Sequence, residues 1–252
     1  MFRISCRMVA AVAIALGSLS VTAQAQWGTL EGQFVLDGAV PTLEPLVAKG
    51  AAGVKDAAVC AKNGVPDESL VVNPDNKGIQ NIVVYLRKAP SKIHPDLAEV
   101  PEGKAVLDQL GCQFIPHVSF ARAGQTIQCK NSDGAGHNVH TYPFSNNAEN
   151  FILAPLDTTG KDIVMKLGES RPVKLGCDIH TYMVGWCVVL DHPYAAVTDA
   201  DGKFRIENLP VGKHSFIVWH EEAGYIEKKW DVTIKDGDNS EDAVKVKAAD
   251  FK

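Results

Sequence analysis

Three potential metal ligands follow one another at intervals of three residues near the middle of the chain: Cys177, His180 and Met183. A second histidine, His137, lies upstream in the run Gly136-His137-Asn138-Val139-His140. One short loop can point the first three side chains inward, so a neighbouring strand must supply His137. One thiolate, two imidazoles and a weakly bound thioether are the ligand set of a blue-copper site. The spacing therefore predicts one type 1 copper with ligands His137, Cys177, His180 and Met183.

The first 25 residues are typical of a secretory signal sequence. Arg3 and Arg7 supply positive charge, residues 9–21 are mostly apolar, and Ala23-Gln24-Ala25 has the small residues of a cleavage site. The apolar run is too short to cross a bilayer. We therefore expect removal of a signal peptide, a periplasmic or secreted mature protein, and no membrane span in it.

Five cysteines follow the expected signal sequence, and an odd number leaves one thiol unpaired in an oxidising compartment. Copper ligation by Cys177 accounts for that thiol. Cys129 and Cys187 share the inward phase of two predicted strands, where a second disulfide and two buried thiols are both compatible with the pattern. Cys60 and Cys112 are the remaining pair, and we expect a disulfide between them.

Composition excludes some classes of function. The chain has 25 Lys and Arg against 30 Asp and Glu, a formal net charge of −5, and loss of Arg3 and Arg7 with the signal makes the remainder more acidic. Such a chain lacks the basic surface that binds nucleic acid. No Ser/His/Asp set, paired carboxylates at motif spacing or phosphate-binding loop is visible in the sequence. We therefore expect a protein that is neither an enzyme nor a nucleic-acid binder.

The elements that position the four ligands are expected to be strands. Runs rich in Val, Ile and Thr alternate with Gly, Asn, Asp and Pro, which indicates strands joined by turns. These runs are residues 81–87, 126–131, 161–167, 186–190, 203–206, 214–219 and 231–234. Residues 102–110 could hold one short helix. The pattern predicts an all-β fold built as a sandwich.

The ligand loop resembles that of amicyanin-type blue-copper cupredoxins. The sequence from Cys177 to Val189 reads C-D-I-H-T-Y-M-V-G-W-C-V-V, similar to the family's Cys-x2-His-x2-Met loop and the strand after it. The segment 123–131 and the run 136–140 resemble the strand and the first copper histidine of the same family. Ile179 and Thr181 stand where amicyanins have prolines. The resemblance covers residues 110–191 and implies a cupredoxin Greek-key β-sandwich.

The resemblance also implies roles for single residues. It favours His137 over the competing His140 as the first imidazole ligand, because Asn138 then occupies the position that braces the ligand loop in cupredoxins. It implies that the exposed edge of the His180 ring is the electron port. A second metal site at His140 or at the single histidines stays possible but is not favoured; these are His117, His192 and His220.

The C-terminal part resembles another β-sandwich. Residues 196–216 are similar to the hairpin of transthyretin-like, carboxypeptidase-regulatory-like domains, and strands typical of that module occur far upstream at 28–34 and 81–86. We therefore expect a discontinuous sandwich that contains the cupredoxin as an insertion. The expected division is a signal peptide at 1–25, sandwich and linker at 26–105, cupredoxin at 106–191, and the rest of the sandwich at 192–252.

The function expected from these features is electron transfer by one type 1 copper. Its partner would be another redox protein, such as a cytochrome c or a dehydrogenase. Two alternatives remain open at this stage. The chain could bind or traffic copper without a redox partner. It could also be a carbohydrate- or protein-binding β-sandwich whose copper loop is vestigial.

Overall fold

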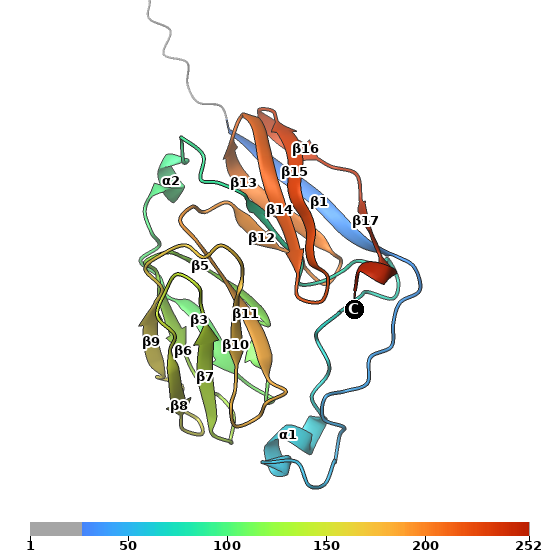
Figure 1. Ribbon diagram of the computed structural model, residues 1–252, viewed down its shortest axis with the longest axis vertical. Coiled ribbons are helices and arrows are strands. Elements are labelled where there is room, and N and C mark those ends of the chain that lie inside the picture. The colour runs from blue at the N-terminus through green and yellow to red at the C-terminus, as the bar shows by residue number, and fades with distance from the viewer. Residues whose placement is uncertain (1–26, 252) are drawn as a thin grey trace, which may run out of the picture.

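The computed structural model describes residues 27–251, which form two β-sandwiches (Figure 1). Strands β3 to β11 build the central sandwich, and β1, β2 and β12 to β17 build the outer sandwich. The all-β fold expected from the sequence is thus confirmed. The predicted signal sequence lies outside the described residues. No helix in residues 27–251 is long and apolar enough to cross a membrane.

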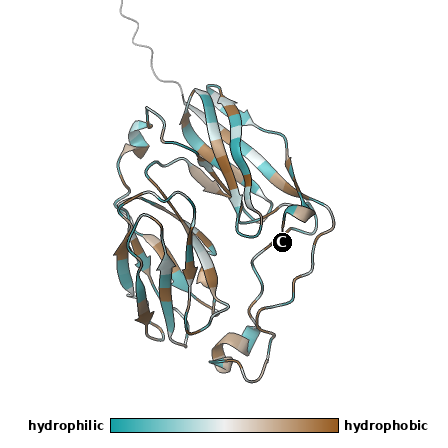
Figure 2. Cartoon of the chain, viewed as in Figure 1, coloured by the Kyte–Doolittle hydropathy of each residue, from teal (hydrophilic) through white to brown (hydrophobic). Residues whose placement is uncertain are grey.

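The central sandwich consists of a sheet in the order β5-β11-β10-β7-β8 and a sheet in the order β4-β3-β6-β9. Hydrophobic and hydrophilic residues alternate along several of these strands, which places one apolar face of each sheet in the core (Figure 2). The bounds are β3 Ala105–Gln109, β4 Phe114–Ile115, β5 Val118–Arg122, β6 Thr126–Cys129, β7 His137–Tyr142, β8 Asn150–Leu153, β9 Lys161–Val164, β10 Val173–Gly176 and β11 Val184–Leu190.

The outer sandwich joins the beginning of the described chain to its end. β1 pairs with β13, β16 and β17, and β2 pairs with β12 and β14 in a sheet that continues to β15. Strands from before and after the central sandwich in sequence therefore share both sheets. The bounds are β1 Trp27–Asp37, β2 Val83–Leu86, β12 Ala195–Val197, β13 Lys203–Pro210, β14 Gly212–His220, β15 Gly224–Ile234, β16 Gly237–Ser240 and β17 Val244–Lys247.

The short helix expected within residues 102–110 is not formed, and this prediction was wrong. Residues Ala105–Gln109 are strand β3, which pairs in parallel with β6 and antiparallel with β4. Leu107 and Gln109 are buried, whereas Val106 is exposed and Asp108 is half-buried. This period of two is that of a strand. Pairing on both edges of β3 outweighs the helix propensity of the segment.

An apolar junction connects the two sandwiches. Val83 and Tyr85 of β2 pack in one cluster with Val118 of β5 and with Val188 of β11. At its edge the rings of Trp186 and Trp219 meet edge to face, with centroids 4.9 Å apart. Aromatic pairs in this arrangement add stability beyond their buried area.

A long excursion between β1 and β2 carries the first helix away from the outer sandwich. Helix α1, Ala57–Asn63, lies within a loop that we call the capping loop, residues 47–65 (Figure 1). Val47, Ala61 and Val65 are buried in the same core cluster as the central sandwich. The other helices are small: α2 Pro95–Ala98 and the 3₁₀ turn η1 Ala248–Asp250.

The structure contains one of the two disulfides that the sequence allowed. Cys60 of α1 and Cys112 form the predicted disulfide. Cys129 and Cys187 are free, so the second disulfide that the sequence allowed is not formed. Burial raises the pKa of Cys129 to about 12 and that of Cys187 to about 11. Both thiols therefore stay protonated, whereas disulfide exchange requires a thiolate.

Buried His220 should make the folded state sensitive to acid. Burial lowers its folded-state pKa to about 4, below the ordinary value of about 6.5. As the pH falls from 6.5 toward 4, the unfolded chain binds a proton that the folded chain does not, which costs about 3 kcal/mol of stability. Urea unfolding at pH 7 and pH 4.5 should show a larger loss for the wild type than for His220→Gln. Equal losses would contradict this assignment.

Candidate metal centre

The four predicted ligands come from one strand and one loop of the central sandwich. His137 is the first residue of β7, and Cys177 directly follows β10, which pairs with β7. The loop then closes on itself, because the backbone N–H of Cys177 donates to the carbonyl of Met183 at 3.3 Å and that of Met183 to the carbonyl of His180 at 2.8 Å. Strand β11 begins at the next residue. Adjacent strands thus fix both ends of the ligand loop.

Three of the predicted ligands converge. The Nδ1 atoms of His137 and His180 lie 3.0 Å apart, and the Sγ of Cys177 lies 3.9 Å from the Nδ1 of His180. All three donor atoms fall within 4.8 Å of one another, and all three residues are buried. Met183 is 2 % exposed and shares the core cluster of Cys177. The structure therefore brings together the thiol and both imidazoles that the spacing indicated.

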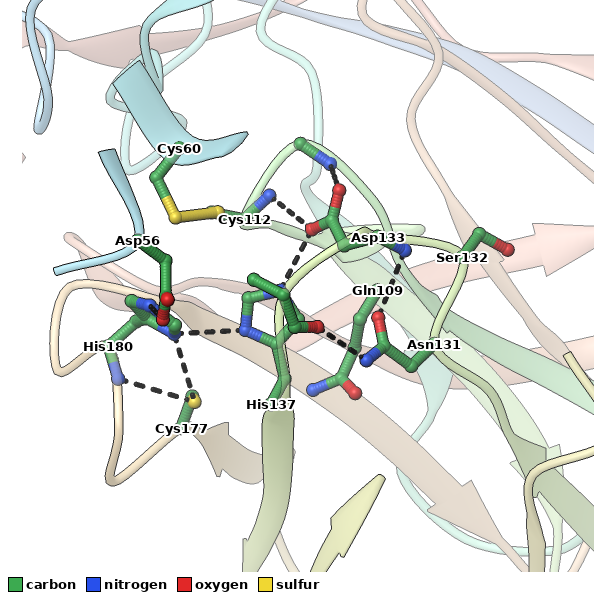
Figure 3. A network of polar contacts seen from close by, with 12 residues as sticks. Asp56, Cys60, Gln109, Cys112, Asn131, Ser132, Asp133, His137, Cys177 and His180 are labelled. Carbon is green, nitrogen blue, oxygen red and sulfur yellow. Dashed lines mark hydrogen bonds and ion pairs between the residues drawn. A yellow bond between two sulfur atoms is a disulfide. The ribbon is translucent and has the colours of Figure 1, made fainter. Parts of the chain in front are cut away.

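Each imidazole uses its other nitrogen to contact a carboxylate. The Nε2 of His137 lies 2.9 Å from Asp133, and the Nε2 of His180 lies 3.0 Å from Asp56 (Figure 3). A carboxylate beside Nε2 holds the proton there, which leaves the Nδ1 lone pair free to bind a metal. Asp133 is itself held by the backbone N–H groups of Gly111 and Cys112, both at 2.7 Å.

This arrangement fits one metal ion. Metal–nitrogen bonds of about 2.0–2.1 Å allow two nitrogens on the same ion to lie up to about 4 Å apart. The separation of 3.0 Å between the Nδ1 atoms of His137 and His180 is within this limit. A soft thiolate with two imidazoles suits copper or zinc rather than magnesium or calcium. Cys112, Asp133 and His137 also lie close together, but the disulfide occupies the sulfur of Cys112.

Hydrogen bonds prepare the metal-free site for binding. Burial would raise the pKa of Cys177, but the hydrogen bond with His137 and nearby backbone N–H groups lower it overall. Burial would lower the pKa of His137, but Asp133 and Cys177 raise it to about 9. These contacts favour a thiolate at Cys177 beside a protonated His137 imidazole. A metal bound there would displace the proton from His137.

Asn138 makes the bracing contacts that its position implied. Its Oδ1 accepts hydrogen bonds from the backbone N–H of Asp178 at 2.6 Å and of Ile179 at 3.3 Å. Its Nδ2 donates to the side chains of Asn150 and Asp178. The loop residues between Cys177 and His180 are thereby tied to β7, which keeps the spacing of the ligands fixed.

The other histidines lie apart from these ligands. His140 contacts Asp178 at 3.1 Å and stacks on Tyr142. His117 is bonded to Glu221, and the Nε2 of His192 lies 3.0 Å from the carbonyl of Leu86. Within residues 27–251, no group of three metal-binding side chains includes His117, His140, His192 or His220. The structure therefore provides no preformed second site at these histidines among the described residues.

The expectation of an exposed electron port at His180 was wrong. Its side chain is 0 % exposed, and the carboxylate of Asp56, the N-cap residue of α1, contacts its Nε2 edge. Sequence reasoning missed both Asp56 and Asp133. Asp133 lies only four residues before His137, and this short separation could have indicated that its carboxylate contacts the His137 ring. Asp56 is 124 positions from His180 and carries no such signal.

Comparison with known proteins shows limited similarity. The chain matches no protein-family model, and no curated protein matches it. A reduced Cu(I) form of an amicyanin variant at pH 4 is 22% identical over 36% of this chain and 87% of that chain, with a TM-score of 0.30. Another reduced amicyanin variant is 19% identical over 42% of this chain and 97% of that chain, with a TM-score of 0.29.

A Cu-containing nitrite reductase from Thermus scotoductus SA-01 is 20% identical over 39% of this chain and 27% of that chain, with a TM-score of 0.30. Identities near one fifth and TM-scores near 0.30 are too low to carry a conclusion about function. The interpretation of the site therefore rests on its own residues and geometry.

The ligand assignment distinguishes the two histidines of β7. Replacing His137 with Ala removes one of the three converging donors and should abolish the visible absorption of the copper-loaded protein. Replacing His140 with Ala should leave the spectrum nearly unchanged, since its ring faces Asp178 and Tyr142 instead. Titration with Cu(II), followed by absorption and by mass spectrometry, measures both effects. The reverse result would exchange the two assignments.

Proposed function

We propose that this chain is an exported type 1 copper protein that carries electrons between redox partners in the periplasm or outside the cell. One observation carries the proposal: the thiol of Cys177 and the Nδ1 atoms of His137 and His180 converge in a buried place. Two carboxylates contact the Nε2 atoms of these histidines and fix the tautomer of each ring. These residues, with Met183, make the ligand set of a blue-copper centre.

In this proposal Cys177 supplies a thiolate, His137 and His180 supply neutral imidazoles, and Met183 supplies a weak axial thioether. Copper bound there would contribute a one-electron Cu(II)/Cu(I) couple. The strands β7, β10 and β11 hold the ligands from separate positions in one sheet, and Asn138 ties the loop to it. Such a rigid frame keeps the ligand positions the same before and after electron transfer.

Export is supported by the disulfide between Cys60 and Cys112, because disulfides persist mainly in oxidising compartments. The signal-like sequence at 1–25 agrees with export. A redox protein, such as a cytochrome c or a dehydrogenase, remains the proposed partner, and we propose no catalytic reaction for the chain. The strand pairing of the outer sandwich supports the proposal that the central sandwich is inserted within the outer one. That the central sandwich is a cupredoxin and the outer one a transthyretin-like domain is part of the same proposal.

One observation favours a second function, the binding or trafficking of copper without electron transfer. The capping loop covers the edge of His180 that a redox partner would approach, as expected of a protein that binds or traffics copper without rapid electron exchange. The electron self-exchange rate of the copper protein, measured by NMR line broadening, distinguishes the two functions. Fast self-exchange supports the carrier, and negligible self-exchange supports the copper-binding alternative.

The colour of the copper protein tests the type 1 site. We expect one copper per chain and intense visible absorption from charge transfer between the Cys177 thiolate and Cu(II). Cys177→Ser should abolish this absorption, since a hydroxyl does not supply a thiolate. Cys129→Ser is the matched control, because its buried thiol is outside the ligand group. Stoichiometric copper in a colourless wild-type protein would refute a type 1 centre.

Met183 should adjust the potential without being essential for binding. In Met183→Leu the copper and the colour should remain while the reduction potential rises, because a weak axial thioether stabilises Cu(II) more than Cu(I). Leu is close to Met in volume, so the buried position should stay packed. Spectroelectrochemical titration gives the potential. Complete loss of copper would instead make Met183 a primary ligand.

A further inference from the structure

Asp56 has an unusual place for a residue at the beginning of a helix. It is the N-cap of α1, yet its side chain makes no capping hydrogen bond, and its backbone is left-handed with φ 52° and ψ 39°. An N-cap Asp ordinarily bonds the first turn of its own helix, and among residues other than Gly this backbone is adopted most readily by Asn, Asp and His. The carboxylate instead reaches the Nε2 of His180 at 3.0 Å (Figure 3).

The capping loop is anchored without help from the side chain of Asp56. Val47 and Val65 exchange two backbone hydrogen bonds of 3.2 and 2.8 Å, which close the base of the loop. Next to this closure, a Cβ on Gly64 would lie 2.9 Å from the carbonyl oxygen of Val47, so a glycine is needed there. The disulfide from Cys60 to Cys112 joins α1 to the central sandwich. Substitution of the Asp56 side chain should therefore leave the loop in place.

The carboxylate of Asp56 lies between the His180 ring and solvent. The side chain of His180 is 0 % exposed and that of Asp56 is 39 % exposed. A carboxylate that accepts a hydrogen bond from Nε2–H makes Nδ1 a stronger electron-pair donor to a metal. Its negative charge also favours Cu(II) over Cu(I). Removal of such a partner typically lowers metal affinity 10–100-fold.

We propose that Asp56 is a positioning residue of the metal centre, which fixes the Nε2–H tautomer of His180, closes its ring edge to solvent and stabilises Cu(II) relative to Cu(I). Only the stabilisation of Cu(II) rests on the proposed function. The tautomer and the closure are properties of the metal-free protein.

Three substitutions at the same position separate charge, hydrogen bonding and closure. Asp56→Asn keeps an acceptor oxygen and tolerates the left-handed backbone, so it removes only the charge. Asp56→Gly also tolerates that backbone, but it removes the acceptor and opens the ring edge. Asp56→Glu restores a carboxylate. Asp67→Asn is the charge-matched control from the adjoining segment, because Asp67 bonds the backbone of Ser69 and is not among the groups around the ligands.

The first measurement uses the metal-free full chain. Nitrogen-15 NMR of the His180 ring should show a proton on Nε2 that exchanges slowly with water in the wild type, in Asp56→Asn and in the Asp67→Asn control. In Asp56→Gly this proton should exchange at least tenfold faster. Equal exchange in the wild type and Asp56→Gly would overturn the closure. A proton on Nδ1 of wild-type His180 would overturn the tautomer.

The second measurement uses the copper-loaded protein. Asp56→Asn should bind Cu(II) about tenfold more weakly with Cu(I) affinity little changed, which raises the reduction potential by about 59 mV. Asp56→Glu should recover most of this change, and Asp67→Asn should match the wild type. An unchanged potential in Asp56→Asn would overturn the stabilisation of Cu(II). A wild type without a type 1 spectrum would refute the proposed function and leave the NMR result to decide the role of Asp56.

Discussion

The proposed metal centre depends on one constraint: each candidate ligand imidazole needs an acceptor for its Nε2 proton in a place that water does not reach. Asp133 and Asp56 meet this need, and a closed circuit of contacts holds them. Asp133 accepts from the backbone of Cys112, and Cys112 is bonded to Cys60 in the helix that begins at Asp56. Asp56 contacts His180, whose ring faces His137, which returns to Asp133. Each member therefore limits the movement of the next.

Sequence alone predicted the parts of this centre that lie close together along the chain. Cys177, His180 and Met183 are separated by two residues each, and Asn138 follows His137 directly, so local spacing carries the information. Once Cys177 was assigned to the metal and Cys129 and Cys187 to the core, Cys60 and Cys112 remained as the expected disulfide pair. The all-β class followed from short runs rich in Val, Ile and Thr that are separated by Gly, Asn, Asp and Pro, which is also local information.

The remaining features depend on contacts between distant parts of the chain. Asp56 stands in a stretch of Ala, Gly and Lys with no motif, and its role appears only when the capping loop meets the ligand loop 124 positions later. Residues 102–110 could hold a short helix on sequence grounds, because the propensity of an isolated segment does not report the two strands that pair with β3. The free thiols of Cys129 and Cys187 could not be deduced from the sequence. The alternation of inward and outward residues along a strand shows that both side chains point into the core, but not whether their sulfur atoms are bonded.

The pairing of β1 has a consequence for the order in which the chain can fold. β1 is synthesised first, whereas its three partner strands β13, β16 and β17 are synthesised only after the whole central sandwich. Every strand of the central sandwich lies between them, so that sandwich has its complete set of hydrogen-bonding partners while β1 is still unpaired. The central sandwich, which carries the candidate metal ligands, can thus assemble early, whereas the outer sandwich closes only once β17 has been synthesised.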